Sequence, residues 1–219
     1  MAKILVINPN SSKAVTRSME ACLQVFSPSR HEIRCIELEA APPGIETDAH
    51  VAEVVPLLVD AAGRTDADAI VIACFSDPGI SAVRAATDIP VIGIAEAAYL
   101  AALGLGARFG IASMGQSSIL RHRRYLEALK IDGRLAGDRS IDMTVSELVA
   151  TDAITPVTRI GATLRDQDGA EVVILGCAGL GSYRAAVQAE LGIPVIDPVQ
   201  AGVALAATQA ELGYARRRA

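Results

Sequence analysis

The sequence predicts an α/β fold made of two pseudo-symmetric domains, each a parallel sheet flanked by helices, with a cleft between them. Apolar segments of strand length alternate with segments of helical periodicity, which is typical of parallel sheets covered by helices. Two of the apolar segments end at a cysteine, Cys74 and Cys177, and small or turn-forming residues follow. Residues 108–118 also repeat the pattern of residues 3–12: a basic residue, an apolar strand, a polar turn and a Ser-Ser pair. This repeat indicates two similar halves.

The first expected element is an apolar strand, Lys3–Ile7, followed by a polar turn. Ser11 or Ser12 caps the next helix, which extends to about Phe26 because its apolar residues recur every three or four positions. Cys22 lies on that apolar stripe, so we interpret it as an inert core residue.

A second strand, Glu32–Leu38, contains Cys35, which we interpret in the same way. A loop rich in Pro and Gly leads to a helix over about 48–63, and the strand that ends at Cys74 follows.

The residues after Cys74 predict the start of a helix, because Asp77 suits the N-cap and Pro78 suits the first turn. The strand Val91–Ile94 and an alanine-rich helix, Glu96–Leu103, complete the first half.

The second half opens with the strand Arg108–Ala112 and a helix that extends to about Leu129. Apolar residues at helical spacing interrupt the basic cluster Arg121–Arg124, so we interpret it as a solvated face, and Arg216–Arg218 as a frayed tail. Residues 133–143 show no clear pattern and are long enough to contain one strand. The remaining elements are helices near Val145–Ala150 and Pro156–Asp168, strands at Glu171–Cys177 and Pro194–Ile196, and a helix at Pro198–Glu211.

Composition and charge argue against several classes of partner. The net charge is −5, only 3% of the residues are aromatic and no basic stripe exists, so no nucleic-acid binding is expected. No apolar run approaches the roughly 20 residues that span a bilayer, so we expect no membrane partner. Met1 leads directly into a strand pattern without the features of a secretory signal, which indicates a cytoplasmic location.

The sequence carries no motif for a metal or a nucleotide cofactor. The four cysteines form no C-x-x-C motif, and the three histidines show no ligand spacing. Neither a dinucleotide fingerprint nor a G-K-[ST] phosphate loop is present. We therefore expect neither a metal nor a cofactor.

Four segments should meet in the cleft, because ligands of open α/β sheets bind outside the carboxyl ends of the strands. These segments are Asn8–Ser12, Cys74–Asp77, Ser113 and Cys177–Gly179.

Two thiols on opposite sides of a cleft suit a two-base proton transfer. One thiolate removes a hydrogen from a carbon beside a carbonyl group, and the other thiol returns one from the far face, which inverts the stereocentre without a cofactor. A cysteine pKa of about 8.5 allows both forms to be reached near neutrality. A helix start after Cys74 would favour its thiolate, with Asp77 partly opposing this effect. The sequence thus predicts catalytic roles for Cys74 and Cys177 and a small-molecule substrate.

The enolate formed in such a reaction needs hydrogen-bond donors for its oxygen. Backbone N–H groups after each cysteine and the side chains of Asn8, Ser11 and Ser113 are candidates. Gly176 and Gly179 allow the backbone to approach a ligand closely.

Some of these residues have a second interpretation. Asn8 and Ser11 equally suit a turn and a helix cap. Ser76 and Asp77 suit the local chemistry of a helix start better than an acid–base role, and Glu46 has no evident partner.

Five segments match a known pattern: Ile7–Ser11, Ala73–Gly79, Pro90–Ala97, Leu175–Gly179 and Ile193–Asp197. On these segments the chain resembles, over nearly its whole length, the aspartate/glutamate/hydantoin racemase superfamily, and most closely its hydantoin racemase branch.

The resemblance implies two pseudo-symmetric α/β domains and cofactor-independent racemisation by Cys74 and Cys177. It also implies that the last helix returns to the first domain, so that residues 1–97 plus 198–219 form one domain and 98–197 the other. Members of the superfamily are commonly homo-oligomers. Implied substrate contacts are Asn8, Ser11, Phe75, Ser76, Ser113, Ala178 and Gly179.

Two departures from the branch leave the substrate open. Ser113-Met114 stands where the branch has a Thr-Thr pair, and residues 196–202 differ from its usual Asp-Gly-Val. Candidates are 5-substituted hydantoins, allantoin, and aspartate, glutamate or another free amino acid. Few positive charges are placed to hold extra carboxylates, which argues against the free amino acids.

Other activities also stay open. A cofactor-free decarboxylase of the same superfamily needs one thiol only, so the presence of two argues against it. A cis–trans isomerase of unsaturated diacids and a non-catalytic small-molecule binding protein are the remaining alternatives.

Overall fold

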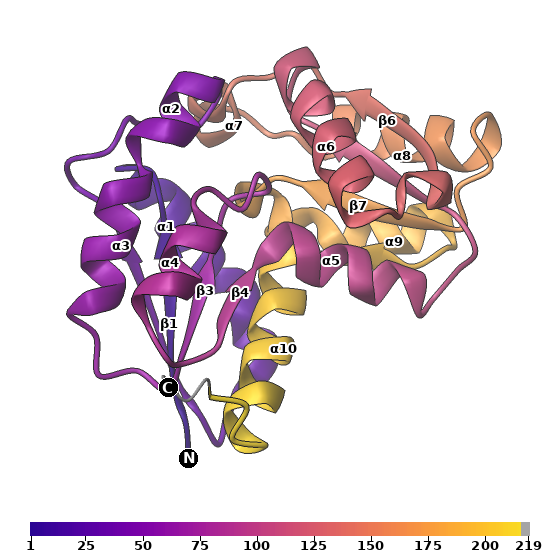
Figure 1. The fold of residues 1–219 in the computed structure, drawn as a ribbon. Helices are drawn as coiled ribbons and strands as arrows, with labels where there is room; N and C mark the ends of the chain where they lie inside the picture. The colour runs from indigo at the N-terminus through magenta and orange to yellow at the C-terminus, as the bar shows by residue number, and fades with distance from the viewer. Residues whose placement is uncertain (216–219) are drawn as a thin grey trace.

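Two four-stranded parallel sheets organise the chain in the computed structural model, which describes residues 1–215 (Figure 1). Their strand orders are β2-β1-β3-β4 and β6-β5-β7-β8, and every strand pair is parallel. Each half therefore uses the same topology, and the prediction of an α/β fold with two similar halves is confirmed. The tail expected at Arg216–Arg218 lies outside the described residues.

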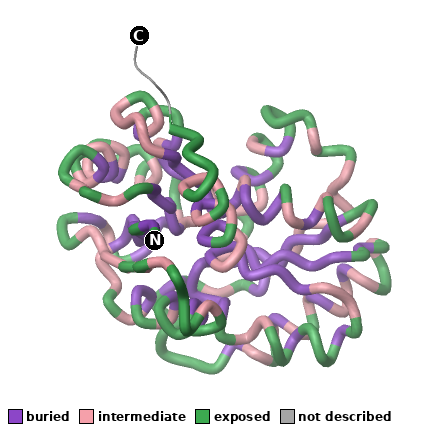
Figure 2. The backbone as a smooth tube through the Cα atoms, turned by 90° about the horizontal axis from the view of Figure 1, so that it is seen from below, coloured by how far each residue is buried: buried purple, intermediate pink, exposed green. Residues whose placement is uncertain are grey.

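Strands β3 and β7 lie in the interior of the two sheets. Both are buried along their whole length, as expected for parallel strands covered on both faces (Figure 2). The strands are β1 (Lys3–Asn8), β2 (Glu32–Glu37), β3 (Ala69–Ile72), β4 (Val91–Gly93), β5 (Phe109–Ser113), β6 (Leu135–Ser140), β7 (Val172–Gly176) and β8 (Val195–Ile196).

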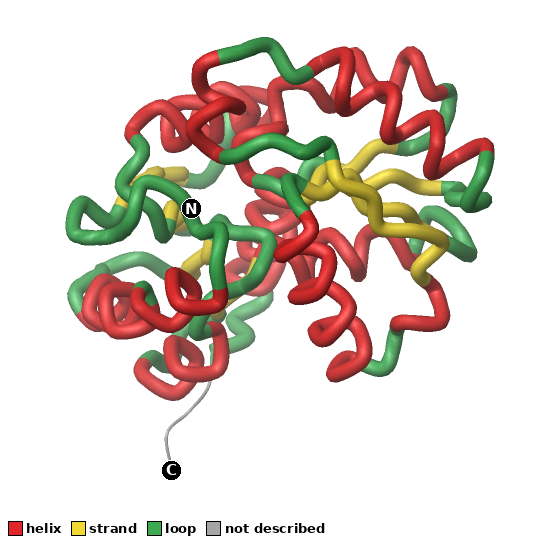
Figure 3. The backbone as a smooth tube through the Cα atoms, turned by 90° about the horizontal axis from the view of Figure 1, so that it is seen from above, coloured by secondary structure: helices red, strands yellow, loops and turns green. Residues whose placement is uncertain are grey.

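Helices cover both faces of each sheet, and Figure 3 shows the two groups of strands with helices around them. The helices are α1 (Lys13–Cys22), α2 (Asp48–Glu53), α3 (Val55–Gly63), α4 (Ile80–Ala86), α5 (Ile94–Leu103), α6 (Gln116–Leu129), α7 (Val145–Ala150), α8 (Ile154–Asp166), α9 (Arg184–Leu191) and α10 (Pro198–Glu211). Short 3-10 helices occur at Leu23–Phe26, Asp132–Arg134 and Ala178–Tyr183. Helix α9 was not predicted from the sequence.

Alternation along β1 distributes its side chains between two cores. Ile4 and Val6 pack in a cluster with residues of α1 and α10, whereas Leu5 and Ile7 pack with residues of α3 and α4. Helix α10 contacts β1, β3 and β4 as well as α5. We retain the division into residues 1–97 plus 198–219 and 98–197 as a proposal.

Helix α5 leads from the first sheet to the second. It contacts α10 as well as β7 and β8 of the second sheet. Tyr99 of α5 lies between Phe75, at a ring-centroid distance of 5.5 Å, and Phe109 of β5, at 5.7 Å. This aromatic cluster joins the loop after β3 to the second half. Within the described part of the chain, no helix combines the length and apolar character needed to cross a membrane.

Two predicted helices differ from the structure. The helix expected over 48–63 is divided at Val54, because Pro56 lies in the first turn of α3 and cannot donate to the preceding turn. The helix start expected at Asp77-Pro78 is wrong: α4 begins at Ile80, after Gly79 in the left-handed conformation.

Candidate active site

The carboxyl ends of both sheets open onto one cavity of about 840 Å³, part of which is open solvent. Residues 73–76, after β3, and 176–178, at the end of β7, line it from opposite halves. Cys74 and Cys177 thus lie in the walls of one cavity, and both are free and partly exposed. Within residues 1–215, no three His, Cys, Asp or Glu side chains are grouped so as to hold a metal ion.

The two thiols have different electrostatic surroundings. Burial raises the pKa of the Cys74 thiol to about 11, while the backbone N–H and hydroxyl of Ser76 and the charge of Arg121 oppose this rise. Burial raises the pKa of Cys177 to about 12, with the N–H of Gly179 opposing it. The positive charge of Arg121 acts on Cys74, whereas no positive charge is among the described groups that act on Cys177, so the surroundings favour the thiolate at Cys74.

A helix start after Cys74 was expected from the sequence to favour its thiolate. The structure gives the thiolate a different support. Helix α4 begins only at Ile80, and Asp77 raises the pKa of Cys74 instead of capping that helix. Ser76 and Arg121 supply the stabilising contacts.

Arg121 and His122 are buried in the cavity wall, so the prediction of a solvated face at Arg121–Arg124 is wrong for these two residues. The signal for this was available, because Leu126, four residues after His122, belongs to the buried stripe of α6. The prediction of a solvated face followed from the rule that charged side chains in a helix are usually exposed.

Arg121 is held mainly by neutral acceptors. Its guanidinium donates to Ser76 Oγ at 3.3 Å, to the Glu46 carbonyl at 3.1 Å and to Ser118 Oγ at 3.2 Å. The nearest carboxylate, Asp48, is 3.7 Å away and is paired more closely with Arg124, at 2.8 Å. The positive charge of Arg121 is therefore only weakly neutralised, which makes it available to the cavity.

Glu46, whose partner could not be predicted from the sequence, connects the two halves. Its Oε1 accepts a hydrogen bond from Val145 N of α7 at 3.0 Å. Its carbonyl oxygen accepts from Arg121 and, at 2.9 Å, from Ser117 Oγ. These contacts fix the loop before α2 across the cavity.

Three of the seven predicted substrate contacts line the cavity, and a fourth, Gly179, contacts the Cys177 thiol through its N–H without lining the cavity. The three that line the cavity are Phe75, Ser76 and Ala178. Asn10 also lines it; it lies in the segment Asn8–Ser12 that was expected at the cleft but was not named as a substrate contact.

The remaining three residues, Asn8, Ser11 and Ser113, are not among those that line the cavity. The Asn8 amide is used within its turn, donating to Asn10 Oδ1 at 2.9 Å and to Thr16 Oγ1 at 3.2 Å. Ser11 donates its backbone N–H to Pro42 O at 3.0 Å. Ser113 is fully buried. Substrate contacts at these three residues stay predictions.

Asp77 holds the loop that carries Cys74. It has a φ of 42°, is buried, and accepts hydrogen bonds from the backbone N–H groups of Ala95 and Glu96, each at 2.9 Å. The hydroxyl of Tyr125 lies 3.2 Å from its Oδ2. Burial raises the pKa of Asp77 to about 7. The carboxyl group therefore caps α5, not the helix that follows it in sequence.

We expect Gly93→Ala to disrupt this cap. A Cβ at Gly93 would lie 2.2 Å from the Asp77 carboxyl carbon, so the loop would have to move. The free energy of unfolding, measured with urea, should fall by about 3 kcal/mol, as for other overpacked sites. The control is Gly63→Ala, whose Cβ meets nothing within 4 Å and which should not destabilise. Equal stability of the Gly93 variant and the unmodified protein would contradict the cap.

Comparison with known proteins gives consistent results. The model of the Asp/Glu/Hydantoin racemase family matches residues 4–206. A hydantoin racemase from Paenarthrobacter aurescens is 35% identical, over 99% of this chain and 94% of its own. One from Pseudomonas sp. (strain NS671) is 32% identical, over 96% and 87%. The structure of allantoin racemase from Klebsiella pneumoniae superposes with a TM-score of 0.93 at 32% identity, over 99% of this chain and 91% of that one.

Proposed function

Because the chain belongs to the Asp/Glu/hydantoin racemase family, we propose that it inverts the C5 stereocentre of 5-substituted hydantoins or of allantoin. Family membership makes it a PLP-independent racemase, an isomerase that acts on a small molecule. The finer proposal adds the cyclic ureide substrate and proton transfer between Cys74 and Cys177.

One observation carries the mechanism: Cys74 and Cys177 line the same cavity from opposite halves. A substrate between them presents one face of C5 to each thiol. One sulfur, as thiolate, takes the C5 hydrogen, the negative charge moves onto the neighbouring carbonyl oxygen, and the other thiol gives its proton to the far face. The reaction leaves the thiol and thiolate exchanged, so the opposite enantiomer is processed by the reverse transfer.

The charges around the cavity support this assignment. Arg121 and Ser76 lower the pKa of Cys74, so they favour the thiolate that begins the reaction. Arg121 also offers a fixed positive charge near the forming enolate in a largely buried site, where such charges stabilise transition states strongly.

The substrate proposal depends on the relatives, which are named hydantoin racemase and allantoin racemase. The residues also favour a neutral ring over a free acidic amino acid, because among the described residues that line the cavity Arg121 is the sole Arg or Lys, while Glu46 is acidic. A decarboxylase would need one thiol only.

The direct test is loss of optical rotation for separate L- and D-5-substituted hydantoins and allantoin, beside an enzyme-free blank. We expect both enantiomers to be racemised without added cofactor. If none reacts, the ureide proposal is wrong, and aspartate, glutamate, arylmalonates and maleate are tested next.

Assembly into a homo-oligomer stays a prediction, which light scattering on the purified protein checks.

The pH dependence follows from the raised thiol pKa values. Each direction of the reaction begins with one of the two thiols as a thiolate. Their pKa values, about 11 for Cys74 and about 12 for Cys177, lie above the working range, so the reactive fraction grows with pH. We expect kcat/KM, measured with the blank subtracted at each pH, to rise about tenfold per unit from pH 7 to about 10. A profile that is flat between pH 7 and 9 would contradict a thiol base.

A further inference from the structure

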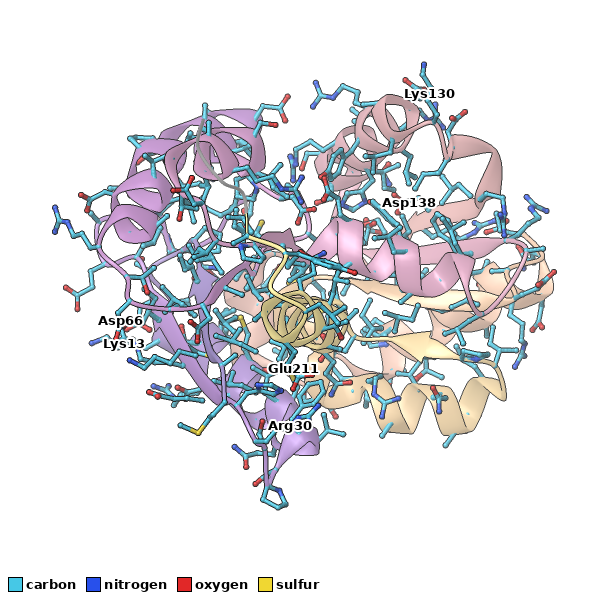
Figure 4. The ribbon with its side chains drawn as sticks, turned by 60° about the horizontal axis from the view of Figure 1, so that its bottom comes forward. Lys13, Arg30, Asp66, Lys130, Asp138 and Glu211 are labelled. Atoms are coloured by element: carbon cyan, nitrogen blue, oxygen red, sulfur yellow. The ribbon has the colours of Figure 1, made fainter. Side chains whose placement is uncertain are left out.

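A buried polar cluster reaches the cavity wall at His122 and takes no part in the proton transfer described above. It joins Ser113 of β5, His122 of α6 and Asp138 of β6, whose side chain is labelled in Figure 4. His122 Nδ1 lies 2.9 Å from Asp138 Oδ2 and 3.2 Å from Ser113 Oγ, and Ser113 Oγ also donates to Asp138 Oδ1. The side chains of His122 and Asp138 are only 2% and 4% exposed.

With Asp138 as a carboxylate, this geometry favours one tautomer of His122. Since the Ser113 hydroxyl uses its hydrogen on Asp138, it can only accept from His122. Asp138 is an acceptor as well, so Nδ1 of His122 must carry a hydrogen. In the neutral ring, Nε2 then has a free lone pair and is an acceptor.

Nε2 of His122 is available to a ligand. No described residue forms a hydrogen bond with this atom. It is also absent from the fully buried polar atoms that lack a partner, so it is accessible. The ring lies edge-on to Phe75, at a centroid distance of 5.0 Å, and both residues line the cavity. His122 therefore adds an acceptor to a wall in which its neighbour Arg121 supplies donors.

We propose that His122, oriented by Asp138 and Ser113, binds the substrate by accepting a hydrogen bond from a ring N–H. This assignment deepens the proposed function and depends on it. A cyclic ureide alternates carbonyl and N–H groups around its ring, so a site that holds it needs acceptors beside donors. His122 serves as the acceptor, and Ser113 and Asp138 are positioning residues.

Two variants separate binding by Nε2 from support of the fold. In His122→Asn the side-chain amide keeps a donor for Asp138 but has nothing at the position of Nε2. In His122→Gln the longer side chain again places a polar atom near that position. Thermal unfolding of both variants shows whether the fold is kept.

The measurement uses 5-substituted hydantoins that are unmethylated, N1-methylated or N3-methylated. One methylated substrate should lose about tenfold in kcat/KM with the unmodified protein, the loss expected for one hydrogen bond. The same methylation should change little with His122→Asn, which already lacks the acceptor, and His122→Gln should recover part of the activity on the unmethylated substrate.

Binding of 5,5-dimethylhydantoin, which has no C5 hydrogen to transfer, gives a second readout by calorimetry. We expect His122→Asn to weaken it about tenfold. If the unmodified protein racemises hydantoins but methylation costs the same in both proteins, or His122→Asn binds normally, the role of His122 is wrong. If the unmodified protein neither racemises nor binds any ureide, the proposed function itself is wrong and the assignment with it.

Discussion

Replacing either Cys74 or Cys177 by serine should reduce kcat for racemisation about a thousandfold, because each removes one of two acid–base groups. A serine hydroxyl is a far weaker acid than a thiol, so it neither forms the base nor returns the proton efficiently. The remaining cysteine can still remove and return a proton on its own face. Each variant should therefore keep hydrogen–deuterium exchange with one enantiomer only, and the two variants should prefer opposite enantiomers.

Cys35→Ser is the matched control for these variants. Cys35 lies in β2, packed against the core and away from the cavity, and burial raises its pKa to about 12. It should racemise normally. If both cavity variants also racemise normally, Cys74 and Cys177 are structural residues and the mechanism is wrong.

Replacing Arg121 by methionine should lower kcat/KM about a hundredfold, because the site loses a fixed positive charge near the reacting atoms. In the unmodified protein the charge of Arg121 opposes the effect of burial on Cys74, so the pKa of Cys74 should rise further in this variant. The rate of alkylation of Cys74 by iodoacetamide as a function of pH, measured in the Cys177→Ser background, reports that pKa directly.

Two further variants control this experiment. Arg123→Met changes an exposed arginine two residues away and should leave both measurements unchanged. Arg121→Lys keeps the charge but loses the fork of donors to Ser76 and Glu46. Compared with Arg121→Met, it should restore the pKa of Cys74 more fully than it restores kcat/KM. An unchanged pKa of Cys74 in Arg121→Met would show that the charge does not act on the thiol.

The features that the sequence predicts well are those that depend on burial along the chain. Strands β3 and β7 read as continuous apolar runs because both faces of each are covered, and their ends fix the positions of Cys74 and Cys177. The repeated Ser-Ser turn after β1 and β5 likewise reflects the repeated topology. These are local patterns, visible without knowing which segments meet.

The features that it misses depend on contacts between distant segments. Buried Arg121 donates to the carbonyl of Glu46, in a loop that comes to it from the other half. Asp77 looks like a cap for the helix after it, but the left-handed turn directs its carboxylate to the backbone of α5. The hydrogen bonds of the Ser113 hydroxyl with His122 and Asp138 likewise join separate elements, while a substrate contact at Ser113 stays a prediction.

In the proposed mechanism, Cys74 and Cys177 act on opposite faces of C5: one removes the C5 hydrogen and the other delivers its own proton. The most direct measurement follows each enantiomer of a 5-substituted hydantoin in D₂O during the first few per cent of conversion, with NMR and chiral separation. If this mechanism is correct, deuterium appears in the inverted product first, while the remaining substrate keeps its hydrogen. If substrate and product gain deuterium at equal rates from the start, a single base acts on both faces, and the roles proposed for Cys74 and Cys177 are wrong.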